Sequence, residues 1–355
     1  MTVIYASASG RAGVLGNPTD GYGGSVIACS IRERAHVAVE QHSGPLTVCT
    51  ASRCVQFRTH DDLELAGDEF DIARGVVRYL EALDLNVRVS FSTSVPRQAG
   101  LAGSTALLAS LLSALLAYRG VTYTPYYLAE VNRIIEYEVL GIQCGYNDAY
   151  MTTFGGLNYM DFRGKEYYRP LEREDYATIE RLTPFVGPLP FIVAHTGLEH
   201  HSGAFHRPLR ERWLEGETAV VEGYQRIAEL ARWGKRALLE RDWFTFGRLM
   251  NENWEIQESL APSGDVNAKM VRVALRNGAI GAKLAGAGGG GTIIALTLEP
   301  ERTAKALKEA GASHITTLAP DAPGVTVEIL PTAVALERVF GTAWREVAAS
   351  LEVED

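Results

Sequence analysis

The sequence predicts an α/β protein of two domains, in which helices pack against sheets. Val87, Val89 and Phe91 alternate with polar residues, as in a half-buried strand, and residues 94–118 then pass through a turn of small residues into a long apolar helix. Residues 184–190 (PFVGPLP) interrupt both helix and strand with three prolines and a glycine. We therefore expect domains over residues 1–186 and 187–355.

The remaining elements follow from the same periodicities, punctuated by glycine and proline. In the first part of the chain we expect strands over residues 2–8, 25–31, 35–40 and within 45–60, helices over 68–83 and 126–140, and a strand over 157–162. In the second part we expect strands over 191–197, 292–296 and 325–330, and helices over 215–240, 242–258, 265–277, 300–311 and 332–350.

Composition limits the classes of function. A net charge of −9 argues against a general nucleic-acid binder or a protein that binds anionic membranes. Four cysteines without metal-type pairing favour reduced thiols in a cytoplasmic enzyme, and the N-terminus lacks the pattern of a signal peptide. The uncharged run 98–118 is long enough to cross a membrane, but its glycines and serines favour a buried helix, and we expect no membrane partner.

The turn before the long helix has the chemistry of an anion site. Gly100 and Gly103 allow the backbone to approach a ligand, and Ser104 and Thr105 stand where the helix begins. The free N–H groups and the dipole of a first helical turn attract phosphate. It is not a Walker loop, because no Gly-Lys-Ser/Thr follows. The alternative is a tight strand-to-helix turn in a core.

Three other segments carry polar groups that turning does not require. Arg11 and Asp20 lie in a glycine-rich loop, and Asp148 lies between a glycine turn and the pair Gly155-Gly156. Glu136 and Glu138 stand at a helix C-terminus, where the dipole disfavours negative charge, which suggests a cation partner. The alternatives are a surface ion pair, an Asx turn, an ordinary loop aspartate and simple solvent exposure.

Two further patterns point away from common cofactors. His200, His201 and His206 have spacings that do not place them on one helix face, so a metal site there is disfavoured. The glycines of residues 286–291 formally fit the dinucleotide fingerprint GxGxxG. They precede a predicted strand where that fingerprint requires a helix, so a dinucleotide site is disfavoured as well.

The segment PRQAGLAGSTA, residues 96–106, resembles the nucleotide-phosphate motif of the GHMP kinases, a family that includes galactokinase, homoserine kinase and mevalonate kinase. Ala102 replaces the middle glycine of that motif, and Thr105 replaces its second serine while keeping a hydroxyl. Residues 11–20 resemble the first family motif at the arginine, the Leu-Gly pair and the Thr-Asp pair. Residues 283–291 (KLAGAGGGG) resemble the third motif, with Ala285 where threonine or serine is usual.

This resemblance covers nearly the whole chain and implies the two-domain GHMP kinase fold. It implies an N-terminal α/β domain with a mixed sheet, like ribosomal protein S5, and a ferredoxin-like C-terminal domain. The active site would lie in the cleft between them, with ATP and Mg²⁺ as cofactors.

The resemblance also implies the roles of residues. Asp148 would be the catalytic base, and Arg11 would stabilise developing charge. The expected ATP phosphate contacts are Pro96, Gly100, Leu101, Ala102, Gly103, Ser104, Thr105, Gly288 and Gly289. The expected Mg²⁺ ligands are Thr105, Ser104 and Glu136, with Glu138 as the alternative acid. The expected substrate contacts are Asp20, Gly16, Asn17, Tyr22, His206, Arg207, Arg210 and Gly286.

The substrate class follows from three stretches, LGNPTDGYGG, GYNDAYMTTFGGLNYMDF and SGAFHRPLRERW, which resemble the glucuronokinase branch of the family. That branch phosphorylates the anomeric hydroxyl of D-glucuronate, and the carboxylate of such a sugar would need a basic contact from Arg207 or Arg210. The alternatives are a heptose or other sugar-1-kinase, mevalonate kinase, or a non-catalytic ligand sensor on the same fold. Retention of Asp148 and Arg11 argues against the sensor. We expect a monomer or homodimer.

Overall fold

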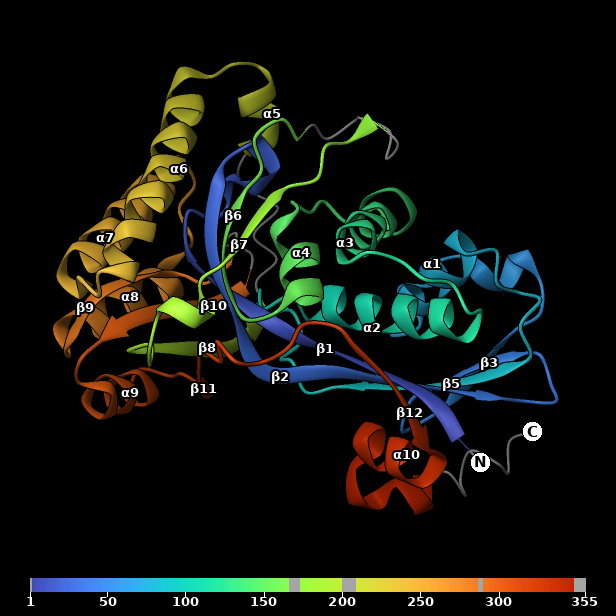
Figure 1. Cartoon of the computed structure of the whole chain (residues 1–355). Helices are drawn as coiled ribbons and strands as arrows, with labels where there is room; N and C mark the ends of the chain where they lie inside the picture. The colour runs from blue at the N-terminus through green and yellow to red at the C-terminus, as the bar shows by residue number, and fades with distance from the viewer. Residues whose placement is uncertain (1, 166–172, 200–208, 287–289, 348–355) are drawn as a thin grey trace.

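Two β-sheets organise the residues that the computed structural model describes, which are 2–165, 173–199, 209–286 and 290–347 (Figure 1). The strands of the first sheet run in the order β12 (Thr326–Pro331), β1 (Thr2–Leu15), β2 (Ser25–Gln41), β5 (Val87–Thr93), β3 (Leu46–Cys49) and β4 (Cys54–Phe57), with β6 (Leu157–Asp161) paired to β2 and β7 (Thr178–Arg181) to β6. Strands β3 and β5 are parallel and the other pairs antiparallel. The prediction of a mixed sheet is confirmed.

The second sheet has the strand order β11 (His314–Thr317), β8 (Phe191–Glu199), β10 (Gly290–Thr297) and β9 (Ala279–Leu284). All three pairs are antiparallel. Numbered along the chain, its strands stand in the order 4-1-3-2, with helices after the first strand and after the third. This is the ferredoxin-like arrangement that the sequence analysis expects.

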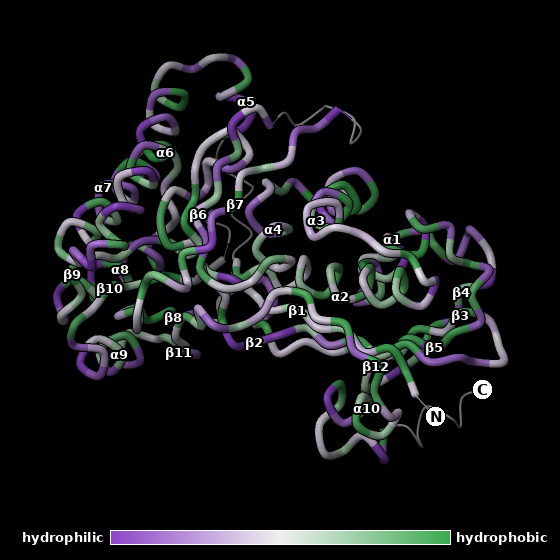
Figure 2. The backbone as a smooth tube through the Cα atoms, viewed as in Figure 1, coloured by the Kyte–Doolittle hydropathy of each residue, from purple (hydrophilic) through white to green (hydrophobic). Residues whose placement is uncertain are grey.

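Helix α2 (Gly103–Tyr118) lies across the first sheet and is the helix with the apolar run (Figure 2). Its residues from Thr105 to Leu116 are all buried, which explains why it is apolar on every side. Helices α1 (Asp71–Tyr79), α3 (Pro125–Ile134) and α4 (Asn147–Phe154) lie on the same side of the sheet, and α10 (Thr332–Phe340) lies on the other (Figure 1). Across the described residues, no helix combines the length and apolarity needed to cross a bilayer.

Two layers of helices enclose the second sheet. One face packs against α8 (Asp265–Arg276) and α9 (Pro300–Glu309). The other packs against α6 (Thr218–Leu239) and α7 (Trp243–Leu260), and α5 (Leu209–Leu214) precedes them. Short 3₁₀ turns lie at Thr19–Tyr22, His60–Leu63, Thr183–Phe185 and Gly341–Ala343.

One hydrophobic cluster joins the two sheets. It contains Leu15 and Ile27 of the first sheet, Phe191 of the second and Phe246 of α7, all nearly inaccessible to solvent. The Phe191 and Phe246 rings meet edge to face, with centroids 5.8 Å apart. Both sheets therefore contribute to one shared core.

Several features differ from the sequence expectations. Arg11, expected in a glycine-rich loop, is a strand residue, because β1 continues to Leu15. Cys49 and Cys54 form a disulfide, because the β3–β4 hairpin places them directly opposite each other, so the expectation of four reduced thiols is wrong. The helix expected over 126–140 is divided, because α3 ends at Ile134 and a π-helical turn, Ile135–Val139, follows. Strand β12 and helix α10, expected in the second domain, return to the first sheet, where β12 pairs with β1.

Truncation of the inter-sheet core tests whether it stabilises both sheets. We expect Phe246→Ala to lower the free energy of unfolding by about 3–5 kcal/mol, the usual range for a buried phenylalanine. The matched control is Phe244→Ala in the same helix, where the ring is 67% exposed and the change should stay within about 0.5 kcal/mol. Urea unfolding measures both, and equal effects of the two substitutions would contradict this view of the core.

Candidate active site

Arg11 on β1 connects three segments that are distant in sequence. Its Nε donates to Asp148 Oδ1 at 2.8 Å, and its Nη2 donates to the same oxygen. Its Nη1 donates to the carbonyl oxygen of Gly100 at 2.7 Å and to that of Ala285 at 3.4 Å. The guanidinium is buried, so it holds the turn before α2, the first turn of α4 and the end of β9 around one point.

The turn before α2 has the backbone conformation of an uncapped helix start. Gly100 has φ +70° and Ala102 has φ +59°, and α2 begins at Gly103. No side chain caps this helix, so the N–H groups of its first turn are left for a ligand. Ala102 adopts the left-handed conformation that a glycine takes freely, and its Cβ makes that conformation about 1–2 kcal/mol less favourable.

Glu136 faces the same helix start. Its Oε1 accepts from Thr105 Oγ1 at 2.7 Å and from Ser104 Oγ at 3.4 Å, and only 3% of the residue is exposed. Burial, helped by the negative charge of Asp148, raises the pKa of Glu136 to about 7. The π-helical turn places Glu136 there and leaves Glu138 exposed, and such turns are frequent at functional sites.

Asp20 lies in the 3₁₀ turn Thr19–Tyr22 and is held by backbone groups. Its Oδ2 accepts from the N–H groups of Tyr146 and Asn147, at 2.7 and 2.9 Å, where α4 begins. Gly145 allows this approach, because a Cβ at that position would lie 1.9 Å from Asp20 Oδ2. Burial raises the pKa of Asp20 despite these hydrogen bonds.

These groups surround one cavity of about 280 Å³. The predicted site residues that line it are Arg11, Asn17, Asp20, Tyr22, Ser104, Thr105, Glu136, Asp148, Arg210 and Gly286. Those that lie in the neighbouring turns without lining it are Gly16, Pro96, Gly100, Leu101, Ala102 and Gly103. Those that fall outside the described residues are His206, Arg207, Gly288 and Gly289.

One wall of this cavity, formed by Ile142, Gln143, Cys144, Gly145 and Asn147, was not among the site residues expected from the sequence. Gln143 accepts from Arg210 Nη1 at 3.3 Å, and the Arg210 guanidinium lies 5.4 Å from the centre of the Tyr137 ring. Gly145 was the available signal, because a glycine beside a catalytic candidate often marks a close backbone approach.

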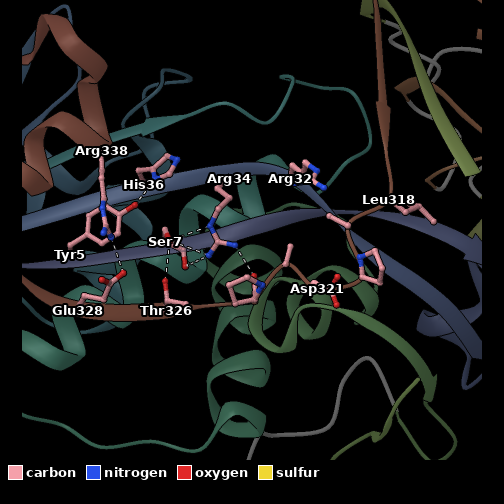
Figure 3. A pocket seen from close by; sticks show the side chains of 14 residues that line it. Tyr5, Ser7, Arg32, Arg34, His36, Leu318, Asp321, Thr326, Glu328 and Arg338 are labelled. Carbon is pink, nitrogen blue, oxygen red and sulfur yellow. Dashed lines mark hydrogen bonds and ion pairs between the residues drawn. The ribbon is translucent and has the colours of Figure 1, made fainter. Parts of the chain in front are cut away.

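A larger hollow of about 610 Å³ lies on the opposite face of the first sheet, between β1, β2, β12 and α10 (Figure 3). Its polar groups mostly satisfy one another. Arg34 donates to the carbonyl oxygens of Ser7, Pro323 and Gly324, the Tyr5 hydroxyl meets His36, and Arg338 pairs with Glu328. None of the predicted catalytic groups lines it, so the smaller cavity is the candidate active site.

The cavity brings together the uncapped start of α2 and the buried carboxylate of Glu136. Within the described part of the chain, no three His, Cys, Asp or Glu side chains gather as a metal cluster. The oxygens of Thr105, Ser104 and Glu136 form a small set of hard donors, which suits a cation that takes its remaining ligands from phosphate.

Comparison with known proteins agrees with this geometry. The family described as "GHMP kinases N terminal domain" matches residues 71–156, and "GHMP kinases C terminal" matches residues 235–315. The Arabidopsis thaliana protein named "Probable glucuronokinase 2" is 32% identical over 84% of this chain and 86% of its own length. Glucuronokinase 1 of the same plant is 29% identical over the same shares of the two chains.

Solved structures of sugar kinases share the fold of this chain. The crystal structure of a D-glycero-D-manno-heptose 1-phosphate kinase from Bacteriodes thetaiotaomicron superposes with a TM-score of 0.71 at 21% identity, covering 93% of this chain and all of the other. Sequence, fold and cavity agree on one assignment: the chain belongs to the GHMP kinase family and is an ATP-dependent phosphotransferase.

Proposed function

We propose that this enzyme transfers the γ-phosphoryl group of ATP to a sugar hydroxyl, the anomeric hydroxyl of a uronic acid such as D-glucuronate. The observation that carries the proposal is the Arg11–Asp148 pair, which faces the uncapped start of α2 inside one cavity. Phosphoryl transfer needs a held triphosphate and an acceptor hydroxyl in line with it, and this cavity offers a place for each.

Asp148 is the group that receives the proton of the acceptor hydroxyl. Its carboxylate lines the cavity and remains partly exposed, while Arg11 holds one of its oxygens. The same guanidinium adds positive charge where negative charge develops during transfer. The N–H groups that open α2 hold the phosphates, aided by the hydroxyls of Ser104 and Thr105.

Glu136 is the protein carboxylate for Mg²⁺, with Thr105 and Ser104 beside it. Mg²⁺ prefers oxygen ligands and, when bound, neutralises phosphate charge. A buried carboxylate whose hydrogen-bond partners are hydroxyls suits a cation, because its charged form is otherwise disfavoured by burial.

The sugar lies between Asp20 and Arg210, which line the cavity together with Tyr22. Asp20 accepts sugar hydroxyls, and the Arg210 guanidinium supplies the cation that a uronate carboxylate requires. The resemblance to two plant proteins named as glucuronokinases supports this substrate class.

The deciding experiment is release of ADP from Mg-ATP in the presence of a panel of acceptors, with the phosphate position of the product assigned by NMR. The panel holds D-glucuronate, D-galacturonate, neutral hexoses, a heptose 7-phosphate and mevalonate. Transfer to C1 of a uronate supports the proposal. Preference for the heptose or mevalonate identifies the alternative substrate, and binding without turnover indicates a sensor.

Removal of the proton acceptor tests the role of Asp148. We expect Asp148→Asn to retain ATP binding and to lower turnover by about 10²–10⁴, the usual loss for a general base. Asp84→Asn is the control, because that carboxylate is exposed and pairs with Arg119 on the surface. Steady-state kinetics and calorimetry measure the two quantities, and near-normal turnover of Asp148→Asn removes the residue from this role.

Charge selectivity tests the role of Arg210. We expect Arg210→Gln to lower kcat/KM for D-glucuronate about 10- to 150-fold, as for loss of a charge-assisted hydrogen bond, and to leave D-glucose nearly unaffected. The matched control is Arg212→Gln in the same helix, where the guanidinium pairs with Glu217 and does not line the cavity. Equal losses for the acidic and the neutral sugar would show that Arg210 does not bind the carboxylate.

The raised pKa of Glu136 predicts a pH-dependent stability without metal or nucleotide. The unfolded chain releases this proton near its ordinary value of 4.5, whereas the folded protein holds it to about pH 7. Folding therefore takes up a proton, and the free energy of unfolding falls as pH rises between these values. Glu136→Gln has no carboxyl group to titrate at this position. The free energy of unfolding of this variant, relative to wild type, should therefore increase from about pH 5 to about pH 8.

Urea unfolding at the two pH values measures this difference, and Glu138→Gln serves as the exposed control. A constant difference across the two pH values would show that Glu136 titrates normally. In the same variant, we expect Mg²⁺-dependent turnover to be lost.

A further inference from the structure

Lys283 is a fully buried lysine at the end of β9 to which the proposed reaction assigns no role. Its Nζ donates to Asn17 Oδ1 and to the carbonyl oxygen of Leu284, both at 2.7 Å. In the described part of the chain, no carboxylate pairs with this ammonium group. Burial, reinforced by repulsion from Arg11, lowers the pKa of Lys283 to about 7.

Lys283 determines which way the Asn17 side chain faces. In its charged form the Lys283 side chain has donors only, so the amide of Asn17 turns its oxygen toward it. Asn17 Nδ2 then faces the carbonyl oxygen of Gly286 and donates to it at 2.9 Å. The side chain expected to contact substrate is therefore engaged within the protein, between two parts of the third motif.

The carbonyl groups that follow Lys283 are bound one after another. Leu284 O accepts from Lys283 itself, Ala285 O from the N–H of Gly13 at 2.7 Å and from Arg11, and Gly286 O from Asn17. The donors to Ala285 and Gly286 come from β1 and the loop after it, so the second sheet is attached to the first at the edge of the cavity.

Asn253 of α7 supports this loop from behind. Its Oδ1 accepts from the N–H of Gly16 at 2.9 Å, and its Nδ2 donates to the carbonyl oxygen of Asn17 at 3.4 Å. Asn253 and Asn17 are both almost completely buried, so solvent does not compete for these bonds.

A buried cation without a carboxylate is a poor choice for stability. Burial of charge disfavours the folded state, and an apolar side chain of similar shape usually serves at least as well. The side chain of Lys283 does make two hydrogen bonds. One is to Asn17, which lines the cavity, and the other is to the carbonyl of Leu284, which leads to it. The contribution of Lys283 is therefore to the positions of the segments that form the site.

We propose that Lys283 is a positioning residue: through Asn17 it fixes residues 284–286, which leave β9, against the Gly16–Asn17 loop, and so sets the place of Gly286 in the wall of the cavity that would bind the phosphates. This role rests on the proposed phosphoryl transfer. A displacement of about 1 Å at a site of this kind can lower the rate about 10²-fold.

The test is Lys283→Met, which keeps the length of the side chain and removes the donor. We expect kcat to fall about 10²-fold and affinity for ADP to fall, while the thermal unfolding temperature stays equal or rises. Lys305→Met, on the exposed side of α9 in the same part of the chain, is the control and should change none of these. Unchanged kcat overturns the proposal. So does a loss of both activity and stability, or a variant that does not fold, because each shows a purely structural lysine.

A double-substitution cycle with Asn17→Leu tests whether Lys283 acts through Asn17. If Lys283 acts through Asn17, the double variant is no slower than the slower single variant. If the ammonium acts only by its charge on the phosphates, the two effects multiply, and the proposal is wrong. Affinity for ADP needs no acceptor, so the cycle is also measured by calorimetry. If the wild-type protein binds ADP but phosphorylates no sugar of the panel, the proposed function is refuted. The double-substitution cycle measured in ADP affinity would still test the role of Lys283.

Discussion

The arrangement of this enzyme depends on one buried guanidinium. Arg11 has a rigid, planar set of donors, and each direction of that set is used by a different segment of the chain. A lysine could not hold Asp148 and two backbone carbonyls in fixed mutual geometry. Because the carboxylate, the turn before α2 and the end of β9 all meet this group, moving any one of them disturbs the other two.

The shifted pKa values in and behind the cavity have one main cause, which is burial. Burial favours the neutral forms of Glu136 and Asp20, which line the cavity, and of Lys283 behind it, so the pKa values of the two acids rise while that of the lysine falls. Burial of these groups destabilises the protein when no ligand is bound. A bound polyanion and its metal stabilise the folded state through the groups that they contact. Nucleotide and metal should therefore contribute to stability as well as to turnover.

Sequence reasoning located the groups whose signal is local. The glycines and hydroxyl side chains of residues 100–105 indicate a helix start. Asp20 and Asp148 are each close in sequence to glycines that indicate turns. It missed features that only pairing between distant segments creates. The Cys49–Cys54 disulfide needs the hairpin register, and the role of Gly145 needs Asp20 beside it. Lys283 belongs to the segment that resembles the third family motif, but its contact with Asn17 exists only once β9 packs beside the loop after β1.

The pairing of β12 with β1 has a consequence for how the chain is made. Residues 2–7 pair with residues 326–331, so this edge of the first sheet lacks its last strand until residue 331 has left the ribosome. Until then β1 presents an open edge, the kind of surface that invites pairing with other chains. While β12 is still missing, the unfinished chain therefore carries an aggregation-prone edge that the finished fold covers.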